Sequence, residues 1–116
     1  MRRGEIYWAN LKPRRSKGEQ GGTRPFIILS DDAFNTNPAW TTVLGVPITS
    51  SDRCRTRGPA VVSLPKGTGG LKIDSFAICY QATTLGKEKL SRRIGTLSAG
   101  DILRVETGLL AAYGSF

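Results

Sequence analysis

A single helical pattern, placed at the end of the chain, most constrains the fold of this sequence. Residues 98–113 carry apolar side chains at helical spacing, and Ser98 with Asp101 three residues later is typical of a capped helix start. Gly114 then follows as a C-cap. The predicted buried stripe consists of Ile102, Val105, Leu109 and Ala112. No strand–helix–strand alternation precedes this helix, so we expect a mainly β fold, a small antiparallel barrel with one C-terminal helix packed on it.

Six stretches rich in β-branched and aromatic residues predict the strands of this barrel. In the third stretch, Leu44, Val46 and Ile48 share one face and are the expected core side chains. Pro47 cannot donate to a ladder, which predicts an edge or a bulge there. The predicted strands are 5–11, 25–30, 41–50, 59–64, a fifth within 72–83, and 92–97, with a turn or short helix at 87–90.

The length and the absence of a linker or internal repeat predict one domain over residues 1–116. No apolar run resembles a signal peptide or reaches membrane-spanning length. We therefore expect a cytoplasmic protein that does not enter a membrane.

The charge of the chain points to a polyanionic partner. Seventeen Lys and Arg residues face nine Asp and Glu residues, which gives a formal net charge of +8. Nucleic acid is the partner that such a small basic domain favours, and a generally basic surface is the alternative.

Residues 18–30 join a glycine-rich polar loop to a continuous apolar strand, with Arg24 at the junction. Pro25 fixes its own φ and favours an extended Arg24. The guanidinium of Arg24 can grip a phosphate through two N–H groups, or it can pair with a surface carboxylate. Two loops add further cations, which could attract a phosphate backbone or simply be solvated. They are Lys12, Arg14, Arg15 and Lys17 in the first loop and Arg53, Arg55 and Arg57 in the second.

The chain has no histidine, and its two cysteines, Cys54 and Cys79, do not form a metal-binding motif. We expect two free thiols, no metal and no cofactor. Nucleophile–histidine systems are excluded, so any chemistry uses Arg, Lys, Glu, Asp, Tyr or hydroxyl groups.

The ordered segments of the chain resemble the MazF/PemK-type toxins, which are sequence-specific endoribonucleases of bacterial toxin–antitoxin pairs. The resemblance implies an SH3-like barrel of the MazF/PemK/CcdB type, a homodimer, and an antitoxin whose acidic segment blocks the RNA groove. The segments that carry it are 3–8 (RGEIYW), 19–25 (EQGGTRP), 46–49 (VPIT), 71–75 (LKIDS), 81–85 (QATTL) and 94–98 (IGTLS).

By this resemblance, Arg24 and Thr49 are the catalytic residues, and Glu19 is the acidic loop residue that contacts RNA. Glu19 is also a candidate general base, since a loop carboxylate could reach the 2′-OH. The family usually has serine where this chain has Gly18, which affects loop contacts more than chemistry. The expected RNA-binding residues are Lys17, Gln20, Ser50, Arg53, Arg55, Asp74 and Gln81.

The resemblance implies cleavage of single-stranded RNA by its own 2′-OH, without a metal, leaving a 2′,3′-cyclic phosphate and a 5′-OH. Arg24 suits the stabilisation of transition-state charge, because guanidinium resists deprotonation. Two other functions stay open from the sequence. One is a toxin of the same fold that binds a protein such as gyrase, and the other is an RNA-binding barrel without catalysis.

Overall fold

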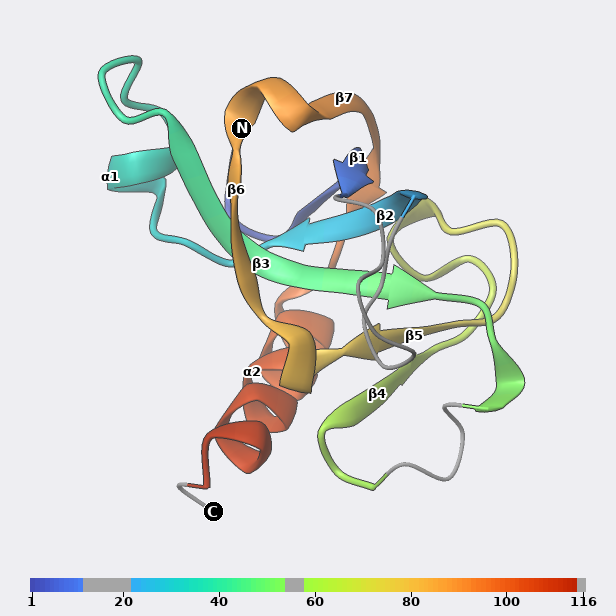
Figure 1. Cartoon of the computed structure of the whole chain (residues 1–116). Helices are drawn as coiled ribbons and strands as arrows, with labels where there is room; N and C mark the ends of the chain where they lie inside the picture. The colour runs from blue at the N-terminus through green and yellow to red at the C-terminus, as the bar shows by residue number, and fades with distance from the viewer. Residues whose placement is uncertain (12–21, 54–57, 115–116) are drawn as a thin grey trace.

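Figure 1 shows the computed structural model of the chain, which describes residues 1–11, 22–53 and 58–114. Within these residues the chain forms seven strands, one more than predicted, and ends in one long helix, as predicted. The strands are β1 (Glu5–Leu11), β2 (Gly22–Ile28), β3 (Thr42–Thr49), β4 (Val61–Leu64), β5 (Ser75–Ile78), β6 (Thr83–Gly86) and β7 (Leu90–Thr96). The helices are α1 (Asp32–Asn35) and α2 (Ala99–Tyr113), and short 3-10 turns are η2 (Thr68–Gly70), η3 (Cys79–Gln81) and η4 (Lys87–Lys89).

The strands form one antiparallel sheet in the order β4-β5-β3-β2-β1-β7, with β6 paired to the start of β3. The predicted mainly β class with a C-terminal helix is confirmed. The described strands do not close into a barrel, because β4 and β7 end this order without pairing with each other. Val105 of α2 packs in one cluster with Leu64 of β4 and Ile6 of β1, so the helix covers one face of the sheet.

Two apolar clusters lie on opposite faces of β1 and β2. The helix-side core contains Ile6 and Ile27 together with Val105 of α2. The far-side core contains Ala9 and Phe26 with residues of β3, β6 and β7. The prediction that the first strand is packed on both faces is therefore confirmed, and side-chain alternation along β1 assigns its residues to one core or the other.

The ends and the buried face of α2 follow the sequence pattern closely. The hydroxyl of Ser98 accepts a hydrogen bond from the backbone N–H of Asp101 at 3.2 Å, and Gly114 ends the helix in the left-handed conformation. Val105 is fully buried, and Ile102 and Leu109 pack against the helix-side core. Ala112 is exposed instead of buried, because the last turn of α2 extends past the sheet (Figure 1).

The third strand differs from the prediction at Leu44, and of the two alternatives predicted at Pro47 the edge strand is wrong. Val46 and Ile48 are buried as expected, but Leu44 is 47% exposed. The helix-side core does not reach the start of β3, where Leu44 lines a shallow hollow with Phe34 and Trp40. β3 is also not an edge strand. Its pairing with β6 ends at Gly45 and its pairing with β5 begins at Ile48, so Pro47 lies where the neighbouring strand changes.

Smaller elements were placed less accurately by the sequence. The connection after the second strand contains α1, and β6 was not predicted. The fifth strand ends at Ile78, so Gln81 lies in the turn η3 and not on a strand as expected. The predicted turn at 87–90 is confirmed by η4, and the last predicted strand corresponds to β7.

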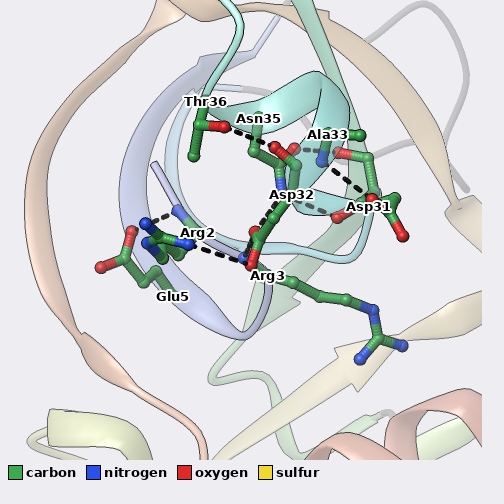
Figure 2. Close-up of polar contacts among 9 residues, drawn as sticks. Arg2, Arg3, Glu5, Asp31, Asp32, Ala33, Asn35 and Thr36 are labelled. Carbon is green, nitrogen blue, oxygen red and sulfur yellow. Dashed lines mark hydrogen bonds and ion pairs between the residues drawn. The ribbon is translucent and has the colours of Figure 1, made fainter.

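Polar contacts around Arg3 fix the start of the chain against three other segments. The backbone N–H of Arg3 donates to Oδ1 of Asp32 at 2.7 Å, and Figure 2 shows Asp32 between Arg2 and Arg3. The Arg3 guanidinium donates to the carbonyl of Leu29 at 3.2 Å and forms an ion pair with Glu106 of α2. The hydrogen bond from the Arg3 backbone is the main reason that the pKa of Asp32 is below its ordinary value.

Candidate nucleic-acid cleft

An open cleft of about 570 Å³ lies between β1, β2, the end of β3, the segment after η2, and β7. It combines cationic, hydroxyl and apolar side chains, which is the composition that a single-stranded nucleic acid requires. Its lining residues are Trp8, residues 23–25, 48–50 and 70–73, Ser75, and residues 92–94. Arg24, Thr49 and Ser50 are thus the sequence-predicted site residues that the structure brings together.

Arg24 and Thr49 come from neighbouring antiparallel strands. The pairing of β2 with β3 ends at Phe26 and Pro47, two residues short of Arg24 on one strand and of Thr49 on the other. The two side chains predicted to act on one phosphate thus come from adjacent strands and line one cleft.

Thr49 is 4% exposed, and its hydroxyl is oriented by a local contact. The backbone N–H of Ser51 donates to Oγ1 of Thr49 at 3.3 Å. This contact uses a lone pair of the hydroxyl, which leaves the O–H proton available to donate. Thr49 can therefore act as a hydrogen-bond donor toward a phosphate oxygen in the cleft.

A buried carboxylate lies beside the cleft on β1. Glu5 is 8% exposed, and its carboxylate accepts hydrogen bonds from the backbone N–H of Arg2 at 2.6 Å, the hydroxyl of Tyr7 at 3.0 Å and the guanidinium of Arg93 at 2.8 Å. Burial alone would raise the pKa of Glu5, but these three donors outweigh it and lower the pKa. The same contact raises the pKa of Arg93, so both groups stay charged.

Sequence reasoning missed several residues of the cleft, namely Trp8, Lys72, Ile73, Arg92 and Arg93. The sequence predicts that Trp8 lies on the same face of β1 as Ile6, and the structure agrees. Side-chain alternation along a strand does not show where the core on that face ends, so the position of Trp8 in the cleft could not be predicted. The sequence signal that could have predicted the cations of the cleft was the pair of adjacent arginines, Arg92 and Arg93, in a predicted strand.

Three predicted RNA-binding residues lie elsewhere among the described residues. Arg53 is exposed just after β3, and its Nε donates to the hydroxyl of Ser51 at 3.4 Å. Asp74 accepts a hydrogen bond from the backbone N–H of Lys66 at 2.8 Å and lines a separate hollow of about 220 Å³. Gln81 is half-buried in η3 and does not line the cleft. The remaining predicted residues, Lys17, Glu19, Gln20 and Arg55, lie outside the described residues.

Cys79 is buried in the helix-side core, and burial raises the pKa of its thiol to about 11. It is therefore a core residue and not a nucleophile.

In residues 1–11, 22–53 and 58–114 there is no cluster of three or more Cys, His, Asp or Glu side chains suited to a metal ion. Over the same part of the chain, no helix has the length and apolar character needed to cross a bilayer.

Comparison with protein families gives a match over almost the whole chain. The model of the PemK-like, MazF-like toxins of type II toxin–antitoxin systems matches residues 2–113. An endoribonuclease MazF of Staphylococcus epidermidis is 32% identical over 98% of the chain and 92% of its own length. The endoribonuclease MazF9 of Mycobacterium tuberculosis is 35% identical over 94% of the chain and 92% of its own length.

Solved structures of the same fold cover the chain equally well. MazF of Deinococcus radiodurans superposes with a TM-score of 0.77 at 23% identity, over 98% of this chain and 96% of that one. A mycobacterial endoribonuclease in complex with its cognate antitoxin superposes with a TM-score of 0.74 at 23% identity, over 98% of this chain and 95% of that one. At these identities the superpositions establish the fold alone.

Proposed function

The chain belongs to the family of PemK-like, MazF-like toxins of type II toxin–antitoxin systems, and it is an endoribonuclease of that family; we propose that it cuts single-stranded RNA in the cleft that contains Arg24 and Thr49. The observation that supports this proposal is that Arg24 of β2 and Thr49 at the end of the neighbouring strand β3 line the same cleft. A cation and a hydroxyl donor in one cleft suit one phosphate.

The proposed chemistry uses the substrate's own 2′-OH as the nucleophile. Its oxygen attacks the adjacent phosphorus, the bond from phosphorus to the 5′-oxygen breaks, and the products are a 2′,3′-cyclic phosphate and a 5′-OH. Arg24 binds two phosphate oxygens and stabilises the charge that develops in the transition state, and Thr49 donates a hydrogen bond to the same group. The 2′-OH proton passes to a base, for which Glu19 of the first loop is our candidate, and a proton from solvent completes the leaving 5′-OH.

A cleavage assay tests this function against the two alternatives, a toxin that binds a protein target and an RNA-binding protein without catalysis. Purified protein is incubated with a long single-stranded RNA in EDTA, and the ends of the fragments are analysed. We expect fragments with 2′,3′-cyclic phosphate and 5′-OH ends. Intact RNA in EDTA that is cleaved after magnesium is added would overturn the metal-independent mechanism, and intact RNA under both conditions would favour the alternatives.

A substrate with one changed nucleotide tests the nucleophile directly. A 2′-deoxy nucleotide at a mapped cleavage site removes the attacking hydroxyl, so cleavage there should stop while other sites are still cut. DNA of the same sequence should remain intact for the same reason. Continued cutting at the deoxy position would mean that water or a side chain is the nucleophile.

We also propose a homodimer that a cognate antitoxin inhibits, acting in the cytoplasm, where mRNA is available. Leu103 and Leu110 lie one heptad apart on α2 and are 62% and 50% exposed in the single chain. Such an apolar strip on a surface helix favours association. The +8 charge suits an acidic antitoxin segment that covers the cleft and excludes RNA from Arg24.

A further inference from the structure

Two adjacent arginines of β7 are both exposed and both line the cleft, but they have different partners. Arg93 is ion-paired with Glu5, a carboxylate that is itself buried. Arg92 is exposed and lines the cleft, and no carboxylate of the described residues lies within ion-pair distance of it. The positive charge of Arg93 is thus offset by Glu5, whereas that of Arg92 has no carboxylate partner among the described residues.

An irregularity in the β1–β7 ladder explains this difference. Tyr7 pairs with Arg93 and Ala9 pairs with Leu90, so β7 has one more residue than β1 between these pairs. Ser91 and Arg92 therefore both lie opposite Trp8, and the hydroxyl of Ser91 donates to the carbonyl of Trp8 at 3.4 Å.

Such an extra residue re-aims the side chains of its strand. Trp8 and Arg92, which lies opposite it, both line the cleft. Arg93 also lines the cleft, but it pairs with Tyr7 and its guanidinium is held by Glu5.

Lys72 provides a second cation of the same cleft. It lies between η2 and β5, is exposed, and lines the same cleft as Arg92. In the part of the chain that the structure describes, no Asp or Glu is ion-paired with Lys72. Trp8 and the 58%-exposed Ile73 add aromatic and apolar surface beside these cations.

We propose that Arg92 and Lys72 form a phosphate-binding subsite of the cleft, which holds a backbone phosphate of the RNA next to the one at Arg24. This inference rests on the proposed RNA-cleaving function of the same cleft. Cations that alternate with an aromatic side chain are the arrangement by which proteins track a single strand. An acidic peptide would use the charges but would leave the Trp8 surface without a stacking base, so RNA is the ligand that fits better.

Salt-dependent binding tests the subsite without any cleavage. The probe is a short mixed-sequence 2′-O-methyl oligonucleotide, which has no free 2′-OH, and its Kd is measured over a range of NaCl concentrations. Each phosphate contact on a single strand contributes about 0.7 to the slope of log Kd against log salt. Arg92→Gln and Lys72→Gln should each reduce the slope by about 0.7, and the double variant by about 1.4.

Three further variants make the comparison specific. Arg93→Gln removes the same charge one residue away and should reduce the slope by less than half as much as Arg92→Gln. Arg104→Gln removes an arginine that is paired with Asp101 outside the cleft, and it should leave the slope unchanged. Arg92→Lys should restore most of the slope, because it restores the charge. Arg92 and Lys72 are exposed, so their variants should keep the wild-type thermal unfolding midpoint.

Equal slope losses in Arg92→Gln and Arg93→Gln, or no loss in Arg92→Gln and Lys72→Gln, would overturn the subsite. Weaker binding of a polyglutamate peptide with unchanged oligonucleotide binding would assign these cations to a protein partner and overturn it as well. Because the probe cannot be cleaved through a 2′-OH, these outcomes are independent of activity. Protein that shows the expected slopes but cleaves no RNA would contradict the proposed function and leave the subsite supported.

Discussion

Gly108 of α2 lies directly against Cys79 of the helix-side core. A Cβ atom on Gly108 would lie 2.8 Å from Sγ of Cys79 and 2.7 Å from a methyl carbon of Val62. The helix approaches the sheet this closely because residue 108 has no side chain, and the buried thiol of Cys79 fills the space that the glycine leaves.

Gly108→Ala should therefore destabilise the protein, although alanine favours helices over glycine. We expect a loss of about 1–3 kcal/mol in the free energy of unfolding, measured by urea denaturation. Cys79→Ala should reduce this penalty in a double-mutant cycle, since it removes the sulfur. Gly100→Ala in the first turn of the same helix is the control, because its Cβ would meet only the Ser98 hydroxyl at 4.0 Å. A stabilising Gly108→Ala would contradict the close packing.

Arg24→Ala should remove nearly all RNA cleavage and leave the fold intact. The loss of one donor to a transition-state charge typically costs about 100- to 1000-fold in rate. Thr49→Ala should have a smaller effect that still removes most of the rate. Single-turnover cleavage, with circular dichroism as the folding check, measures both. Wild-type rates in folded Arg24→Ala would place the active site elsewhere.

Glu5 should make the stability of the protein fall in acid. Its pKa is lower in the folded chain than the ordinary value of 4.5, so the unfolded chain binds the proton first. The stabilisation is complete above the unfolded pKa and is lost as the pH falls through the folded pKa. Urea denaturation from pH 7 down to acid should show a steeper loss for wild type than for Glu5→Gln. Glu88→Gln, at an exposed carboxylate, should keep the wild-type slope, and equal slopes in all three proteins would contradict the role of Glu5.

Leu110→Glu should convert the proposed dimer into a monomer, because it places a charge in the exposed apolar strip of α2. Light scattering at micromolar concentration measures the mass. Ala112→Glu adds the same charge on another side of the last turn, where the residue is also exposed, and it should leave the dimer intact. A monomer mass for the wild-type protein would refute the dimer itself.

Local patterns in the sequence were enough to predict the elements with strong signals. The caps of α2 at Ser98 and Gly114 and the two-sided packing of β1 depend on neighbouring residues, and both agree with the structure. Leu44 was predicted wrongly because alternation gives the face of a strand and not the extent of the core that covers it. Only the tertiary structure shows that the start of β3 lies beyond the helix-side core.

The sequence predicted only part of the cleft, because local patterns do not show which segments the fold brings together. The convergence of Arg24, Thr49 and Ser50 followed from motifs on two strands that the fold makes neighbours. The sequence could not distinguish the surroundings of Arg92 from those of Arg93, because the extra residue of β7 is visible only in its pairing with β1. The different surroundings of two identical side chains are set by Glu5, which lies 88 positions from Arg93.

The pairing of β1 with β7 also has a consequence for how the chain folds. The first strand pairs with residues 22–28 on one side and with residues 90–96 on the other. Contacts so distant in sequence form late in folding, because the long segment between them must close first. The side of the cleft that carries Arg92 and Ile94 therefore forms only when residues 90–96 dock on β1.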